Sequence, residues 1–292
     1  MSKYIFNDNQ IAIIEKLDLN LGIEEAEKLF TSDEHSWEEL ETLLKVANAL
    51  YRSGYPIIED ETYDEYLNYF KTHDPDNPYL LNVEPEVLID SKTVRLPKKM
   101  LSTDKAYSFE EIKKWTERIT KAASEIDFDQ NLIRIRVTPK LDGYAAYDDG
   151  ITLYTRGDGT RGQDITRAFE RGLKVAKNAG RGLGPGEIVI KKSYFDEVLS
   201  EKLEKSRNIQ AAIIAEKKVD EDVQKAIDKG ACVFYPFSLL DNWTGSIEEL
   251  LSNFESILES MWNSVDFDVD GLVLETTNAP IKEHMGSTRK FH

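Results

Sequence analysis

The sequence predicts an α+β protein in which a small helical N-terminal module precedes a domain of antiparallel sheets with flanking helices. Apolar residues recur at helical spacing through the first third of the chain. From Asn131 onward, short β-branched segments alternate with helical patches. We therefore expect a helical module at residues 1–95, including an N-terminal extension, and a second domain at residues 96–292.

The helical module is predicted from its start and stop signals. Ser36 precedes two glutamates, which is typical of a helix start. One apolar face follows at helical period, and the helix is expected to end at Gly54-Tyr55-Pro56. Asp60 is a candidate cap for the next helix, over 63–70. The residues of the apolar face are Leu40, Leu43, Leu44, Ala47 and Leu50.

The second domain is predicted to open with a helix capped by Ser108 that runs to about Ala123. Alternation at 132–136 indicates a strand. Later strands are expected at 151–155, 187–190, 232–237 and 269–274, and helices at 194–205, 211–229 and 247–261.

The composition restricts the class of protein. Of 292 residues, 40% are hydrophobic, which suffices for a core, and 54 acidic against 37 basic residues give a net charge of −17. A chain this acidic should not bind DNA strongly over a broad face. The single cysteine, Cys232, excludes an intrachain disulfide and a thiolate-rich zinc site. Without a signal peptide or a membrane-length apolar run, we expect a soluble, cytoplasmic protein.

The segment 137–143, Val-Thr-Pro-Lys-Leu-Asp-Gly, is the first candidate for chemistry. On a strand, Lys140 and Asp142 would face the same way, and Gly143 would allow a close approach or a bend. An ordinary lysine has a pKa of about 10.4, so a nucleophilic lysine requires burial or nearby positive charge, including a metal. The alternative is a surface lysine paired with Asp142.

A glycine-rich segment follows at 155–166, Thr-Arg-Gly-Asp-Gly-Thr-Arg-Gly-Gln-Asp-Ile-Thr. Its backbone amides are able to approach a ligand, and Arg156 adds a permanent charge suited to a phosphate or a carboxylate. An ordinary hairpin turn has the same composition, so the glycines alone are weak evidence for a ligand site. Their combination with the upstream Lys140 motif is the stronger evidence.

Together, these motifs resemble the adenylation half of the NAD-dependent DNA ligases, from about Leu40 to the C-terminus. The Lys-Leu-Asp-Gly block at 140–143 and the glycine-rich segment are the most specific parts. Supporting matches are Met-Leu-Ser-Thr at 100–103 and Asp-Val-Asp-Gly-Leu-Val at 268–273. Tyr55-Pro56 and Asp60 to Asp64 resemble the family's nicotinamide-binding module. The resemblance implies a nucleotidyltransferase domain of the ATP-grasp-like ligase type.

The resemblance also implies that Lys140 attacks the α-phosphorus of NAD, with Mg²⁺ assisting, to form lysyl-AMP and release nicotinamide mononucleotide. Asp142 would orient the lysine or a ribose hydroxyl, and Asp270 would hold the metal or the lysine. The residues that would hold the mononucleotide are Tyr51, Asp60, Tyr63 and Asp64. The residues implied for the adenylate are Leu101, Ser102, Arg156, Glu187 at a strand start, Arg207, Tyr235 or Phe237 stacking on adenine, and Val273.

Several of these residues also have a purely structural interpretation. Glu187 follows a glycine turn and fits a solvated strand end. Tyr63 fits a helical core position, and Asp270 fits a turn. Tyr235 and Phe237 fit a core.

The chain departs from the family pattern at two positions and at its end. Thr138 replaces a glutamate, and Glu275 replaces a lysine beside the expected phosphates. The domain stops before its last strands, which would carry another lysine. We expect the family's OB, zinc-finger, helix-hairpin-helix and C-terminal domains to be missing from this chain. Two explanations of the short C-terminus are an engineered truncation and a natural first subunit of a split viral ligase. In the second case, nicked DNA would be joined only with a second chain carrying OB and helix-hairpin-helix domains.

The leading hypothesis is therefore the adenylation subunit or fragment of an NAD-dependent DNA ligase. One alternative is an NAD- or nucleotide-binding protein without turnover, suggested by Thr138, Glu275 and the absent lysine. Another is an adenylyltransferase acting on RNA or protein ends. The nicotinamide-binding module favours NAD over ATP, because ATP has no nicotinamide to hold.

Overall fold

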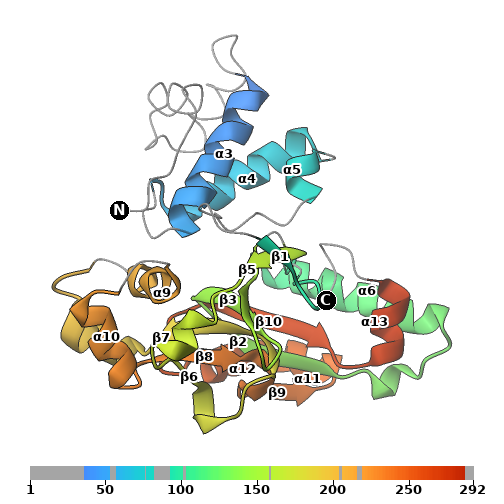
Figure 1. Ribbon diagram of the computed structural model, residues 1–292. Coiled ribbons are helices and arrows are strands. Elements are labelled where there is room, and N and C mark those ends of the chain that lie inside the picture. Colours follow the sequence, from blue (N-terminus) through green and yellow to red (C-terminus); the bar gives the residue numbers. More distant parts are fainter. Residues whose placement is uncertain are drawn as a thin grey trace.

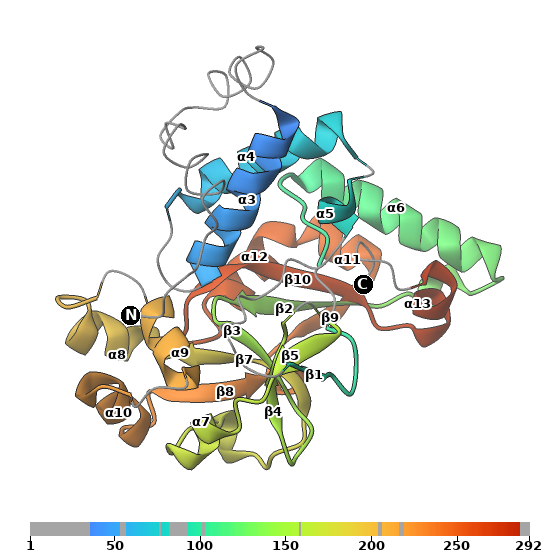
Figure 2. The same ribbon diagram turned by 45° about the horizontal axis from the view of Figure 1, so that its top comes forward.

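The computed structural model describes residues 36–52, 57–75, 77–81, 93–100, 103–157, 159–203, 206–215 and 219–286 (Figure 1). The predicted N-terminal extension up to residue 35 lies outside this part. In both views, helices α3, α4 and α5 lie together on one side of the sheets (Figures 1 and 2). Within the described residues, no helix is long and apolar enough to cross a membrane.

The helical N-terminal part consists of α3 (Trp37–Arg52), α4 (Asp60–His73) and α5 (Pro78–Leu81). The predicted start at Ser36 is confirmed, since its hydroxyl accepts a hydrogen bond from the Glu39 amide at 3.3 Å. The second helix starts earlier than predicted. Glu59 occupies the cap position, so Asp60 is the first helical residue rather than the cap. The predicted apolar face packs into a small core of its own, formed by Leu40, Leu43, Leu44, Tyr66, Tyr69, Phe70 and Tyr79.

Two larger sheets form the rest of the molecule. The five-stranded sheet has the order β4-β3-β7-β8-β6, and the three-stranded sheet has the order β10-β2-β9. A two-stranded sheet pairs β1 with β5. The strand bounds are β1 (Thr93–Arg95), β2 (Ile135–Leu141), β3 (Tyr144–Asp148), β4 (Leu153–Thr155), β5 (Arg161–Gln163), β6 (Lys174–Val175), β7 (Gly184–Ile190), β8 (Cys232–Pro236), β9 (Trp243–Gly245) and β10 (Val269–Thr276).

The predicted antiparallel character is confirmed with one exception, because β6 and β8 run parallel. Three strand starts differ from the prediction, and one of them is that of β7, which begins at Gly184 rather than Glu187. The alternation at 132–136 becomes strand only from Ile135, since Gln130–Leu132 form a 3₁₀ turn. Similarly, β4 begins at Leu153 rather than Ile151, which is an exposed bend residue.

Helices cover each large sheet. Along β2, Ile135 and Val137 point into a core shared with α6, α11, α12 and α13. The other face of β2, which carries Lys140, is half-buried. The five-stranded sheet packs against α9 and α10. The helix bounds are α6 (Phe109–Glu125), α7 (Arg167–Glu170), α8 (Lys192–Tyr194), α9 (Arg207–Ile214), α10 (Glu221–Asp228), α11 (Ile247–Ser252), α12 (Phe254–Trp262) and α13 (Ala279–Met285).

Candidate functional site

Lys140 lies near the end of β2, and its amine meets a carboxylate from a strand that is distant in sequence. The Nζ atom donates to the Asp270 carboxylate at 2.5 Å. A bulge in β10 between Val269 and Gly271 leaves Asp270 as an extra residue opposite β2. Both side chains are about two-fifths exposed, at 39% and 41%. The lysine partner is therefore Asp270 rather than Asp142, which corrects the surface-pair interpretation.

Asp142 has a different partner, because β2 ends at Leu141 and Asp142 lies in the following turn. Its carboxylate accepts from the Arg207 guanidinium at 2.6 Å, and Gln210 donates to its backbone carbonyl at 3.1 Å. Both partners lie on α9. This ion pair attaches α9 to the turn after the lysine strand, and it brings two predicted site residues together.

Gly143 allows β7 to pass unusually close to that turn. A Cβ atom at this position would lie 2.5 Å from both the Cγ atom of Glu187 and the carbonyl oxygen of Ile188. Only a glycine fits without displacing the backbone of β7. Glu187 is buried and lies in the middle of β7, not at a strand start as expected, because the strand begins at Gly184. The glycine thus places the Glu187 carboxylate beside the lysine motif.

The glycine-rich segment forms a tight turn between β4 and β5. The Arg156 amide donates to the Ala145 carbonyl at 3.0 Å, and Gly157 adopts φ +56°. A Cβ atom on Gly157 would lie 1.9 Å from the Arg161 carbonyl oxygen, so the turn requires glycine. The segment connects two strands of different sheets, since β4 pairs with β3 and β5 pairs with β1. Its backbone at Arg156 is bonded to β3, the strand that follows the lysine motif. Asp158 lies outside the described residues.

The predicted aromatic stacking residues differ in exposure. Tyr235 on β8 is buried and packs edge-on against Phe267, with ring centroids 5.6 Å apart. Phe237 follows β8 and is 39% exposed. Val273 on β10 lies directly opposite Thr138 on β2, two pairs along from Lys140. Leu101 and Ser102 lie outside the described residues.

On the helical side, Tyr63 and Asp64 occupy neighbouring positions on α4. The Tyr63 hydroxyl is 2.9 Å from that of Tyr79, so the ring is part of the small helical core. Asp64 forms an ion pair with Lys105 and accepts from the Tyr107 hydroxyl at 3.1 Å. Burial and the Asp64 carboxylate raise the pKa of Tyr107 above its usual range. The side chains of Tyr51 and Asp60 lie outside the described residues.

Glu275 belongs to a charge network that the sequence did not indicate. Its carboxylate contacts Arg136, the residue opposite it on β2, and Lys282 on α13. Lys282 Nζ donates to Glu275 at 2.5 Å. Burial alone would raise the pKa of Glu275, but the hydrogen bonds from Lys282 and Arg136 outweigh it and leave that pKa lowered. Glu275 stands where the family pattern has a lysine, and the positive charges of Arg136 and Lys282 offset its negative charge. The contact with Arg136 spans 139 residues, so no local sequence signal was available for it, whereas Lys282 lies only 7 residues after Glu275.

The side chains near Asp142 fit a polar ligand better than a bare metal site. Within the described residues, no group of three or more histidine, cysteine or acidic side chains could hold an ion. By contrast, the buried oxygens Asn208 Oδ1 and Gln210 Oε1, both on α9, have no hydrogen-bond partner among the described residues. Buried polar atoms normally find partners, so a hydrogen-bonding ligand or water is expected beside them.

A strand lysine held by a carboxylate, with arginine and glutamate nearby in an α+β domain of mostly antiparallel sheets, is consistent with the nucleotidyltransferase class. Comparison with known proteins makes the assignment specific. Residues 90–217 match the family model described as NAD-dependent DNA ligase adenylation domain. Residues 90–217 of this chain are therefore an adenylation domain of the NAD-dependent DNA ligase type.

Individual relatives agree with this assignment. The chain is 71% identical over 250 residues to a DNA ligase of Psychromonas ingrahamii, an alignment that covers 86% of this chain and 38% of that protein. It is 59% identical to a DNA ligase of Shewanella baltica, with 100% and 46% covered, and 48% identical to one of Desulfotalea psychrophila, with 98% and 42% covered. The chain thus spans less than half the length of these relatives.

Proposed function

We propose that this chain carries out the first step of DNA ligation, the transfer of AMP from NAD to Lys140. The Nζ atom would attack the α-phosphorus, forming a P–N bond as the bond to the mononucleotide phosphate breaks. The observation that supports this most directly is the contact between Lys140 and Asp270. The Asp270 carboxylate holds the amine in place and is the nearest group able to accept its proton.

The other site residues would bind and orient the substrate. We propose that Arg156 and Arg207 lie toward its phosphates and that Glu187 accepts from ribose hydroxyls. Tyr63 and Asp64 would hold the mononucleotide leaving group. Mg²⁺ would neutralise charge on the phosphates. Since Mg²⁺ usually binds through one or two carboxylates together with phosphates and water, Asp270 alone is an adequate protein ligand.

A labelling experiment tests the proposal. The chain is incubated with adenylate-labelled NAD or ATP, with and without Mg²⁺, and analysed on a denaturing gel. We expect acid-labile label from NAD only, and none in Lys140→Ala or Lys140→Arg, because arginine keeps the charge but is not deprotonated. Label in the Lys140→Arg protein would contradict the assignment. Binding of NAD without any label would favour the alternative of a non-catalytic nucleotide-binding protein.

We further propose nicked DNA as the final substrate. The net charge of −17 supports a division of labour in which OB and helix-hairpin-helix domains, in a second chain, supply most DNA contacts. Sealing of a labelled nick should then require that added partner, whereas self-adenylation should not. Transfer of label to RNA or protein ends in preference to a DNA nick would favour the other adenylyltransferase alternative.

A further inference from the structure

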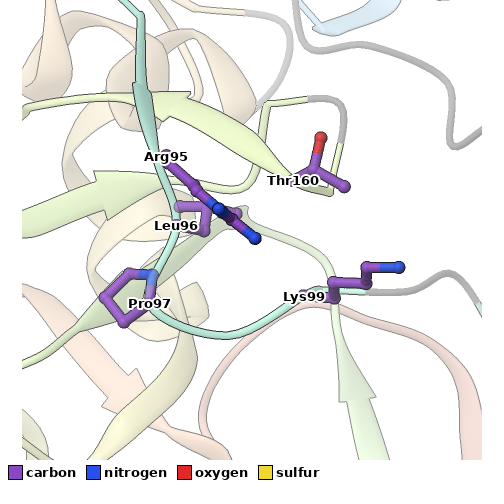
Figure 3. Close-up of a pocket in the computed structure, with 5 residues that line it drawn as sticks. All are labelled: Arg95, Leu96, Pro97, Lys99 and Thr160. Carbon is purple, nitrogen blue, oxygen red and sulfur yellow. The ribbon is translucent and has the colours of Figure 1, made fainter.

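A basic pocket lies beside the two-stranded sheet β1–β5, among residues that have no role in the proposed adenylation step. It has a volume of about 440 Å³ and is lined by Arg95, Leu96, Pro97, Lys99 and Thr160. Figure 3 shows the side chains of Arg95, Lys99 and Thr160 around its opening. This size falls within the range of ~300–1,000 Å³ typical of ligand pockets.

The backbone frame of this pocket is fixed at both ends. The Leu96 amide donates to the Thr160 carbonyl, and the Met100 amide donates to the Gly159 carbonyl, both at 2.9 Å. The side chains of Leu96 and Met100 are buried. Between these anchors, Pro97 restricts the backbone further. The loop Pro97-Lys98-Lys99 is therefore held in place on the glycine-rich segment.

The charge at this pocket contrasts with the rest of the chain. Arg95, Lys98 and Lys99 are exposed, and within the described part of the chain no carboxylate pairs with them. Several exposed lysines elsewhere do pair with acids, as Lys202 does with Asp222 at 2.7 Å. Arg161 lies directly opposite Arg95 across the two strands.

We propose that this basic pocket binds phosphodiester groups of the DNA duplex. Arginine and lysine side chains together with a threonine hydroxyl are typical donors to phosphate oxygens. The cluster gives an acidic chain a local, sequence-independent hold on DNA without requiring a broadly basic face. This inference rests on the proposed function for its choice of DNA, and it adds a binding surface within this chain.

The test compares two double variants of equal charge. Arg95→Gln/Lys99→Gln removes the pocket cations, and Lys174→Gln/Lys229→Gln removes two exposed lysines elsewhere. Binding of a fluorescent nicked duplex is measured by anisotropy between 50 and 200 mM salt, and thermal melts verify folding. We expect the pocket variant to bind about tenfold more weakly at low salt, and to lower the salt slope by about 1.8, or ~0.9 for each lost phosphate contact.

A second measurement separates DNA from the other source of phosphate, the pyrophosphate of NAD. We expect both double variants to label Lys140 from NAD at the wild-type rate. Equal salt slopes in the pocket and control variants would overturn the proposal. So would lost labelling with intact DNA binding, which would assign the pocket to NAD. The pocket variant could show weaker DNA binding and a smaller salt slope even though the wild-type protein never labels Lys140. That result would support the DNA site and would contradict only the proposed adenylation.

Discussion

At the scale of single residues, the candidate site depends on two backbone irregularities. The bulge at Asp270 turns a carboxylate toward Lys140, and the missing side chain of Gly143 lets β7 bring in Glu187. A regular β10 that kept the pairing of Gly271 with Lys140 would place residue 270 opposite Leu141, on the face away from the Lys140 side chain. Each irregularity can be tested by one substitution.

Asp270→Asn should slow adenylation while preserving NAD binding. Asparagine keeps the shape and a hydrogen-bond acceptor, but it loses the charge that holds the amine and accepts its proton. General-base groups contribute about 10²–10⁴-fold to rate, so we expect a fall of at least a hundredfold in the rate of labelling. The rate at saturating NAD and the apparent KM should be measured separately.

Asp268→Asn is the matched control, since Asp268 accepts from Ser206 at 2.7 Å rather than from the lysine. An equal loss in both variants would mean that general acidity of this strand, and not the Asp270 contact, supports the reaction.

Gly143→Ala should lower stability through overpacking. The new methyl group would meet the Ile188 carbonyl at 2.5 Å, so β7 must shift. Overpacking of this kind costs about 1–3 kcal/mol. Thermal denaturation should show a melting temperature several degrees lower. Gly180→Ala is the control, because its added methyl group meets nothing within 4 Å. Equal melting temperatures for the two variants would contradict the close approach.

At the scale of elements, the network around Glu275 joins two strands and a helix. Arg136 comes from β2, Glu275 from β10 and Lys282 from α13. The sequence suggested that a glutamate here would repel substrate phosphates. In the structure, two cations surround it, so the local charge of the network is positive. The substitution therefore has a structural role in attaching α13 to the sheet.

Glu275→Gln should reduce the acid sensitivity of the fold. Because the pKa of Glu275 is lowered in the folded chain, its stabilisation is present above the unfolded pKa of about 4.3 and disappears as the pH falls through the folded value. Stability measured by urea denaturation should therefore fall less between about pH 5 and pH 3 in the variant. At pH 7 the variant should be less stable by about 1 kcal/mol.

Glu283→Gln, an exposed position on the same helix, serves as the control and should keep the wild-type pH profile. A steeper acid transition in Glu275→Gln than in wild type would show that the two cations do not stabilise the carboxylate.

At the scale of the whole molecule, Asp64 connects the helical part to the segment before α6 through Lys105 and Tyr107. The resemblance assigns Asp64 to the mononucleotide, and the structure gives it these protein partners. The two roles are compatible if the ligand binds beside this contact. The two roles predict different effects when Asp64 is replaced and when its partner Lys105 is replaced.

Tyr63→Ala and Asp64→Ala should each lower labelling by NAD at least about tenfold, since each removes a proposed contact to the substrate, and the contact of Asp64 is charge-assisted. Lys105→Ala removes the contact but keeps Asp64, so its labelling should stay within a few-fold of wild type. Labelling rates at several NAD concentrations distinguish the variants. If Lys105→Ala is as impaired as Asp64→Ala, Asp64 acts by holding the segment rather than the ligand.

The sequence by itself determined the helical N-terminal part, the strand that carries Lys140 and the family motifs. These features depend on local periodicity, on caps such as Ser36 and Ser108, and on short contiguous blocks. It also indicated Asp270 as a partner for the lysine, although only by resemblance.

The tertiary structure decided which charged groups meet. Strand pairing brings Asp270 to Lys140 across 130 residues and Glu275 to Arg136 across 139. The turn after β2 likewise brings Arg207 to Asp142 across 65 residues. Register and bulges set these contacts, and a shift of one residue would turn each side chain to the other face. Because that choice depends on packing of the whole sheet, no local pattern in the sequence could specify it.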